Sequence, residues 1–326
     1  MISCTEYIPL YSEFFKFLEK HGGHKAVEDY WQYCSDTGTG DKTNPNSLAA
    51  RCESFGGYEG AVSYWGHSLT EEACDYIEIQ DAKNKFFIGH MRHCPSRGKL
   101  NDLEHIEPYY DYCGHCKWLY SRVLKNYDTV YEMDHTEIDN AACRWILYEN
   151  GHCPDIDWKN ITDDEMREYG KKEGIKLIDL SREGAKYLHR DFHVSCDRAL
   201  KYCGDNFGYD ALVAFLTGYV KLYYAPKIEK IRKEGLSGLK AWIESVYEKE
   251  EASDYIRAMI SDDKLVVEIK KSPAIEHMHS LGKEPSKYYI EGTRTLYKTI
   301  ADETGLTFEM PYYESDGATK LIFTVK

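Results

Sequence analysis

The sequence predicts an α+β fold of two tandem homologous domains, each with an antiparallel sheet covered on one face by helices. Three observations support this. The 326 residues suffice for two domains of ordinary size. Apolar residues recur first at helical spacing and then in short runs typical of strands. Finally, the second half repeats the element order of the first, so we expect the two domains to pack as a pseudo-dimer.

The composition is that of a soluble globular protein, with 42% hydrophobic and 29% charged residues. A formal charge of −14 argues against nucleic acid or an anionic membrane as the main partner, since both require a basic surface. No window approaches 18 uninterrupted apolar residues, and the first residues do not have the pattern of a secretory signal. These features predict a cytoplasmic protein without a membrane-spanning segment.

The first half begins with two expected helices, 7–20 and 25–34, which His21-Gly22-Gly23 separates, and a polar loop over 35–46. The remaining elements are expected in the order helix, helix, strand, helix, strand, strand, over residues 58–65, 70–79, 86–92, 108–125, 129–133 and 143–148. Cys94-Pro95 ends the first of these strands, and a loop is expected to follow it.

An internal duplication predicts the domain boundaries. The run EEACDYI at 71–77 returns as EEASDYI at 250–256, and Cys94-Pro95 returns 178 residues later as Ser272-Pro273. We therefore expect a first domain over 1–150, a polar connector over 151–185 with one short helix after Thr162, and a second domain over 186–326. Helices are expected at 188–202 and 208–224.

Polar residues gather at one end of the first domain, because the expected strands alternate in direction. All eleven cysteines lie at or before Cys203, and in the second copy the matching positions are mostly inert. The residues expected at this end are His93, Cys94, Cys113, His115, Cys116, His135, Glu137, Asp139 and Cys143. Cys116 and Cys143 also fit a simple packing role, because Cys116 lies on the apolar stripe of its helix.

Two segments have the spacing of metal ligands. Alternate residues of an extended segment point the same way, so His135, Glu137 and Asp139 could hold Zn²⁺, Mn²⁺ or Fe²⁺ together with His115. His189 and His193, at i and i+4, share one helix face and could add ligands from the second copy. The alternatives are a solvated acidic turn and partly buried structural histidines.

The same end supplies candidates for catalysis and for substrate binding. Glu137 or Asp139 would act as the general base, and Tyr110 would stabilise developing negative charge. Cys113 is an alternative nucleophile, because a helix N-terminus lowers a thiol pKa. The residues expected to contact the substrate are His90, Arg92, His93, Cys94, Tyr109 and Tyr112.

The chain resembles the L-2-amino-thiazoline-4-carboxylic acid hydrolase-like family, in which a single unit is usual. The resemblance is carried by Gly23-His24-Lys25-Ala26 and Gly208-Tyr209-Asp210-Ala211, by Cys94-Pro95 and Ser272-Pro273, and by the helices that start near Tyr109 and Lys287. It covers both halves but not the connector, and it implies a ring-opening hydrolase. The second copy lacks the cysteine of Cys-Pro, which places any activity in the first.

We therefore expect a metal-assisted hydrolase that opens a small cyclic substrate, such as a thiazoline, a lactam or a cyclic diketone. The abundant thiols would suit an anaerobe. A non-catalytic sensor or carrier for a metal or small ligand is the alternative, and a metal-independent hydrolase with a cysteine nucleophile is a third hypothesis. The expected partners are the small substrate and a second copy of the chain in a homodimer, with no nucleic acid and no membrane.

Overall fold

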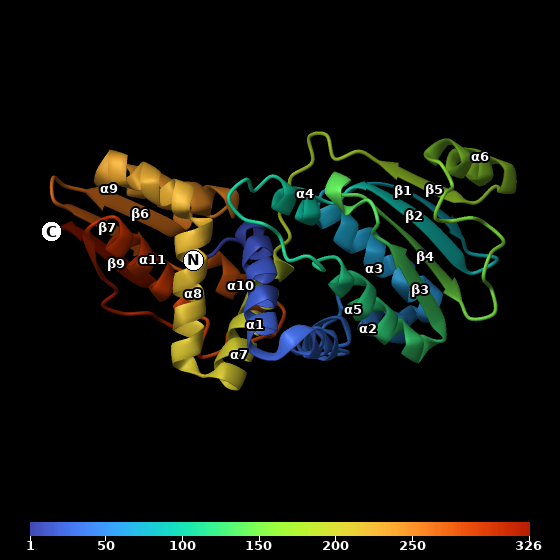
Figure 1. Ribbon diagram of the computed structural model, residues 1–326, viewed down its shortest axis with the longest axis horizontal. Helices are drawn as coiled ribbons and strands as arrows, with labels where there is room; N and C mark the ends of the chain where they lie inside the picture. Colours follow the sequence, from blue (N-terminus) through green and yellow to red (C-terminus); the bar gives the residue numbers. More distant parts are fainter. The chain divides into compact units, whose positions relative to one another are not determined.

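The structure is a computed structural model that describes residues 1–326, and the chain divides into two compact units (Figure 1). Unit 1 contains Met1–Phe17 and Leu188–Lys326, and unit 2 contains Leu18–Tyr187. These limits differ from the predicted boundaries at 150 and 186. The first seventeen residues belong with the second half of the chain, because they supply buried side chains such as Ile8 and Phe14 to unit 1.

Helix α1 (Tyr7–Cys34) carries a kink where the sequence predicted a break. Gly22 and Gly23 both leave the helical conformation, and Gly23 has φ of +67°. Glycine adopts this left-handed region without steric cost, so His21-Gly22-Gly23 can redirect the chain. The expected pair of helices is therefore present, as the two arms of one kinked helix.

Unit 2 is built around a five-stranded antiparallel sheet with the order β3-β4-β2-β1-β5. Its strands are β1 (Asp75–Asp81), β2 (Phe86–His93), β3 (Thr129–Asp134), β4 (Cys143–Glu149) and β5 (Lys176–Leu180). Its helices, besides the second arm of α1, are α2 (Leu48–Phe55), α3 (Gly57–Glu71), α4 (Pro95–Asn101), α5 (Gly114–Leu124) and α6 (Asp163–Glu173).

Both faces of this sheet are covered, whereas the sequence predicted cover on one face. Helices α2, α3 and α5 pack on one face around buried aromatic residues such as Trp65 and Phe87. Helix α6 covers the other face, where Met166 meets Ile77 and Ile79 (Figure 1). The region predicted to be a connector is thus part of the fold of unit 2.

Several predicted elements of unit 2 need correction. Residues 70–79 are not one helix, because α3 ends at Glu71 and Asp75–Asp81 forms β1, whose alternate side chains face the two cores. The segment after Cys94 is helix α4 rather than a loop, since Cys94 caps it and Pro95 occupies its first turn. Helix α5 begins at Gly114 rather than near 108. The short helix after Thr162 is confirmed as α6, which Thr162 and Glu165 start with a capping box.

Unit 1 contains a four-stranded antiparallel sheet with the order β6-β7-β9-β8. Its strands are β6 (Ile256–Ile260), β7 (Lys264–Ile269), β8 (Leu306–Glu309) and β9 (Thr319–Val325). Its helices, besides the first arm of α1, are α7 (Asp191–Phe207), α8 (Tyr209–Tyr223), α9 (Ala225–Lys249), α10 (Pro273–Ser280) and α11 (Glu291–Glu303). Alternate residues of β7 and β9 are buried, including Leu265, Val267 and Phe323, so one face of this sheet carries the core.

The two sheets share a connectivity. Without β5, the order in unit 2 is β1-β2-β4-β3, and the order in unit 1 is β6-β7-β9-β8. In unit 2 the second arm of α1, α2 and α3 precede the first strand, and in unit 1 the first arm of α1, α7, α8 and α9 do so. In each unit a further two helices separate the second strand from the third. The protein is therefore α+β with two antiparallel sheets whose strands follow one another in the same order.

Candidate functional site

In unit 2, three cysteines lie at adjacent strand ends, at one end of the sheet. Cys74 precedes β1, Cys94 follows β2 and Cys143 opens β4. The register pairs Asp75 with His93 and Met91 with Cys143, so these three strand ends are adjacent. The backbone N–H of Cys94 donates to the carbonyl two residues before Cys143, at 2.7 Å. The antiparallel sheet thus gathers thiols that are far apart in the sequence.

Helix α5 adds two more thiols and an imidazole at its N-terminus. Cys113 occupies the N-cap position, and His115 and Cys116 lie in the first turn. The Nδ1 atom of His115 is hydrogen-bonded to the carbonyl of Tyr112, and its Nε2 atom lies 3.3 Å from the sulfur of Cys116. Burial lowers the pKa of His115 to about 4, so the ring is neutral at pH 7. Because a carbonyl accepts from Nδ1, that nitrogen carries the proton, and Nε2 presents its lone pair to the thiol.

Cys94, Cys113, Cys116 and Cys143 form what we call the thiol quartet. Each of the four interacts electrostatically with the other three, and Cys74 interacts with three of them. All four are half-buried. Burial, with a contribution from Glu72, raises the pKa of Cys94 to about 11, and burial, with a contribution from Cys94, raises that of Cys113 to about 12. The quartet is therefore protonated at neutral pH unless a cation offsets the negative charge.

Glu72 lies beside the quartet, and the sequence analysis did not select it. It is the C-cap residue of α3, and its carboxylate accepts from the hydroxyl of Ser96 at 3.5 Å. Its charge contributes to the raised pKa values of Cys94 and Cys116, where burial is the main cause. A carboxylate thus faces two members of the quartet.

Tyrosines surround the same thiols. Tyr112 is 3% exposed and interacts with Cys94, Cys113 and Cys116. Tyr120 and Tyr131, from α5 and β3, lie near Cys116, and burial raises the pKa of both hydroxyls well above 10. These hydroxyls remain protonated and can act as hydrogen-bond donors. Tyr112, which was predicted to contact a substrate, thus lies beside three thiols of the quartet.

His135, Glu137 and Asp139 are not arranged as the sequence predicted. The segment is not extended, because Ile138–Asn140 forms a 3₁₀ turn and Asn101 and Arg97 bind the carbonyl of Ile138. The alternation expected of a strand therefore does not apply. Glu137 and Asp139 are exposed, whereas the Nδ1 atom of His135 is buried without a hydrogen-bond partner.

His90 and Arg92 join β2 to α6 and β5. The Nδ1 atom of His90 lies 2.7 Å from a carboxylate oxygen of Asp163. The guanidinium of Arg92 contacts Asp75 at 2.6 Å, Asp179 at 2.8 Å and Asp163 at 3.4 Å. These charges are satisfied within the fold, so the structure gives both residues a role in holding the sheet together.

His93 is at the end of β2, immediately before Cys94. Its ring packs on Gly98 of α4, where an added Cβ would lie 2.3 Å from the Nε2 atom of His93. Burial lowers the pKa of this histidine, and the nearby Arg182 lowers it further. His93 is therefore neutral at pH 7 and next to the quartet along the chain.

Tyr109 and Tyr110 are grouped around His24 instead. The Nδ1 atom of His24 lies 3.1 Å from the hydroxyl of Tyr109 and 3.3 Å from that of Tyr110, which also donates to Glu19 at 3.0 Å. Asp111 lies 3.7 Å from the other ring nitrogen. Tyr109 is 1% exposed and Tyr110 is 65% exposed, so the group reaches from the interior to the surface.

Two predicted ligands, His189 and His193, belong to unit 1. The ring of His189 stands edge-on to Phe192, with 4.4 Å between ring centroids. His193 is 1% exposed, and its Nε2 atom lies 2.9 Å from Glu250. The ligand atoms of Cys4, His193 and Glu250 all lie within 4.8 Å of one another, and we call these residues the buried trio. His193 was predicted as a ligand, whereas Cys4 and Glu250 were not.

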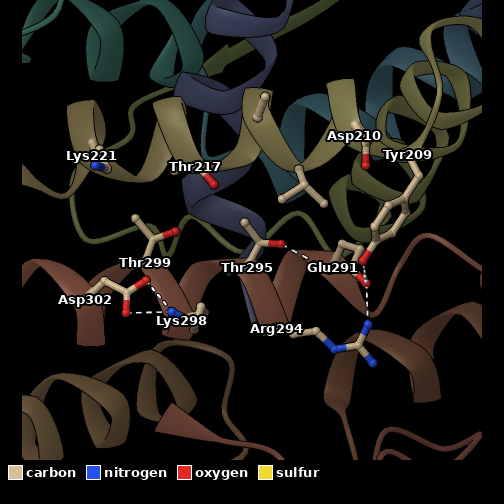
Figure 2. Close-up of a pocket in the computed structure, with 12 residues that line it drawn as sticks. Tyr209, Asp210, Thr217, Lys221, Glu291, Arg294, Thr295, Lys298, Thr299 and Asp302 are labelled. Carbon is tan, nitrogen blue, oxygen red and sulfur yellow. Dashed lines mark hydrogen bonds and ion pairs between the residues drawn. The ribbon is translucent and has the colours of Figure 1, made fainter. Parts of the chain in front are cut away.

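Unit 1 also has a groove of about 460 Å³ between α8 and α11 (Figure 2). Its charged side chains are paired within the unit. Arg294 binds Glu291, Lys298 binds Asp302, and Lys221 binds Glu303. The second carboxylate oxygen of Glu291 accepts from the hydroxyl of Thr295 at 3.1 Å. Lys221–Glu303 joins the two helices, whereas the other contacts lie within α11, and together they give the groove no convergent reactive groups.

A larger hollow of about 760 Å³ in unit 2 lies between α5 and residues 35–53, and its lining includes Trp118, Arg122 and Lys42. Arg122 stacks on Trp118 and pairs with Asp36, while Lys42 pairs with Glu53. No cysteine lines this hollow. The thiol quartet, rather than this hollow, is therefore the candidate reactive site of unit 2.

Comparison with known proteins finds no match among protein-family models, curated proteins or solved structures. None of the helices combines the length and the apolar character needed to cross a membrane. Any assignment of function therefore depends on the chemistry of the side chains described above.

Proposed function

We propose that the protein is a metal-dependent hydrolase that opens a small cyclic substrate at the thiol quartet of unit 2. The observation that carries the proposal is that Cys94, Cys113, Cys116 and Cys143 each interact with the other three. The resemblance to the thiazoline-carboxylate hydrolase-like family supports ring opening, and the second copy of its pattern supports an internal duplication.

The donor types of the quartet would suit a soft or borderline divalent cation. Thiolates and imidazoles are preferred ligands of Zn²⁺, and the Nε2 lone pair of His115 lies beside the sulfur of Cys116. Three of these donors would hold an ion and leave room for a water molecule, whereas four thiolates would leave none. The bound ion would acidify a water molecule and polarise the substrate, which is the chemistry that ring hydrolysis requires.

The protein's own residues supply the rest of the mechanism. The carboxylate of Glu72 accepts the proton of the attacking water, because it faces the quartet from the end of α3. The hydroxyl of Tyr112 donates to the oxygen or nitrogen that gains negative charge as the ring bond breaks. The leaving heteroatom takes up the proton held by Glu72, so the carboxylate is restored.

A nucleophilic cysteine is a weaker explanation. Burial raises the pKa of Cys113 to about 12, whereas a thiol nucleophile needs its pKa lowered toward neutrality. Glu137 and Asp139 are exposed on a turn, so Glu72 replaces them as the proposed base.

The first test is the metal content of the protein purified without added metal, together with ring-opening assays on thiazoline, lactam and cyclic diketone substrates. A variant with Cys113→Ser and Cys116→Ser should lose one equivalent of metal together with turnover. Cys52→Ala is the matched control, because Cys52 is a buried thiol of the same unit outside the quartet. Full metal content in the double variant would contradict the proposed ligands. Metal binding without turnover of any cyclic substrate would favour a sensor or carrier.

A further inference from the structure

Three segments of unit 1 that are distant in the sequence meet at the buried trio. Cys4 lies in the short 3₁₀ turn Cys4–Glu6, His193 in the first turn of α7, and Glu250 at the C-terminal end of α9. Glu250 is 246 residues from Cys4 and 57 from His193 in the sequence. The trio therefore forms only when the first residues of the chain pack against α7 and α9.

The three side chains supply a thiol, an imidazole and a carboxylate within one small volume. Their ligand atoms all lie within 4.8 Å of one another. One oxygen of Glu250 accepts from the backbone N–H of Cys4 at 2.7 Å, and the other lies 2.9 Å from the Nε2 atom of His193. Sulfur, nitrogen and oxygen donors of these types are those that bind Zn²⁺ in proteins.

Burial makes a cation favourable at this position. Cys4 and His193 are 1% exposed and Glu250 is 2% exposed. A carboxylate removed from water requires a compensating positive charge, and Glu6, whose charge acts on the same Met1 amine as that of Glu250, is also buried. Glu6 is already bound by the N–H of Ser3 and the hydroxyl of Tyr224. A divalent ion would balance the carboxylate and a deprotonated Cys4 at once.

We propose that Cys4, His193 and Glu250 bind a structural Zn²⁺ that fastens Met1–Phe17 to the rest of unit 1. The ion replaces the hydrogen bond between His193 and Glu250 with a bond to each of them. Its role is structural, because none of the three ligands is open to a substrate. This site is independent of the thiol quartet, which lies in the other unit and shares no residue with it.

The test measures the zinc-to-protein ratio of the full chain, purified without added metal, by elemental analysis. Cys4→Ala and His193→Ala should each lower the ratio by one equivalent, in the wild-type background and in the variant that lacks Cys113 and Cys116. Cys203→Ala is the matched control, because Cys203 is a fully buried thiol of α7 outside the trio. It should leave the ratio unchanged.

Limited proteolysis gives a second readout. Removal of zinc with a chelator should expose cleavage sites within the first seventeen residues, and the trio variants should be cleaved there without chelator. If the variants fail to fold, X-ray absorption at the zinc edge can be measured on protein that lacks Cys113 and Cys116. A shell of one sulfur with nitrogen and oxygen neighbours is expected. Absence of zinc, or a shell of sulfur alone, would overturn the proposal, as would an unchanged zinc ratio in Cys4→Ala.

Discussion

Glu72 and Glu250 occupy the same position in the two units. Each is the C-cap residue of the helix that precedes the first strand of its sheet. The residue that follows, Ala73 or Glu251, has a left-handed backbone with φ of 53° or 57°. In each unit the carboxylate lies near sulfur, since Glu72 interacts with the thiols of unit 2 and a Glu250 oxygen lies within 4.8 Å of the Cys4 sulfur. One position of the fold thus places a carboxylate at each candidate metal site.

The first prediction concerns the base. Glu72→Gln should leave the metal content unchanged and lower turnover by about 100-fold or more, because general-base catalysis typically contributes factors of 10² to 10⁴. Glu71→Gln is the control, since Glu71 is adjacent but pairs with His67. The measurement is kcat for the ring-opening reaction, with metal content determined on the same samples. A Glu72→Gln variant with normal turnover would remove Glu72 from the mechanism.

The gathering of thiols could be predicted from the sequence, because it depends on strand direction alone. Cys94, Cys113 and Cys143 were placed at one end of the sheet by counting alternating strands, and the register of β1, β2 and β4 brings their ends together. The 3₁₀ turn after His135 could not be predicted in this way. Its acidic composition fits a turn and a ligand loop equally well, so periodicity does not decide between them.

Glu72 was missed for a different reason. It lies in the run EEACDYI, which returns in the second half, whereas the candidate site residues were mostly ones whose matching positions in the second half are inert. The best sequence match also pairs Glu71 with Glu250, whereas the helix ends pair Glu72 with Glu250, 178 residues apart. Identical neighbouring glutamates allow the alignment to shift by one residue, and only the helix end fixes which of them is equivalent to Glu250.

Local sequence patterns could predict neither strand β5 nor the packing of residues 1–17 in unit 1. β5 has a polar composition, and three of its five residues are exposed, because it forms the edge of the sheet. The first arm of α1 has an apolar stripe that any core could bury. Which unit buries it depends on tertiary packing, which the spacing of apolar residues does not report.

The second prediction concerns Arg92. Its guanidinium holds Asp163 at the start of α6 and Asp179 in β5. Arg92→Met should therefore loosen residues 151–185 and make them cleavable in limited proteolysis, while the rest of unit 2 resists. Arg167→Met is the control. Arg167 binds Asp179 and Asp164 in the same set of ion pairs, but its side chain is more exposed than that of Arg92. Equal cleavage rates in wild type and Arg92→Met would show that apolar packing alone holds this segment.

The third prediction concerns Glu78 in β1. Burial raises the pKa of this carboxyl from 4.5 to about 7, although the amide of Gln80 and the charge of Lys176 act in the opposite direction. The fold therefore favours the protonated form, so its contribution to stability is complete below pH 4.5 and is lost as the pH rises through 7. A pKa shift of this size corresponds to a free-energy difference of about 3 kcal/mol between the protonated and the ionised carboxyl in the folded protein.

Glu78→Gln should accordingly make the free energy of unfolding less dependent on pH, with the variant more stable than wild type at pH 8. Urea unfolding at pH 5 and pH 8 measures this difference. Glu168→Gln, at an exposed position of α6, should behave as wild type at both values. A wild-type protein whose stability falls no more than that of Glu78→Gln between the two pH values would show that Glu78 titrates normally.

The last prediction concerns the close contact between Gly89 and Trp145. The two residues are paired across β2 and β4, and a Cβ added to Gly89 would lie 2.0 Å from the Trp145 ring. Trp145 is 2% exposed within the core under α3, so the ring has no room to move aside. Gly89→Ala should therefore cost about 1–3 kcal/mol, as overpacking of a core typically does. Gly66→Ala, in the exposed middle of α3 with no atom within 4 Å of the new Cβ, should instead stabilise by about 0.5–1 kcal/mol. The two urea midpoints should thus move in opposite directions, and a neutral Gly89→Ala would contradict the close packing of Trp145 on β2.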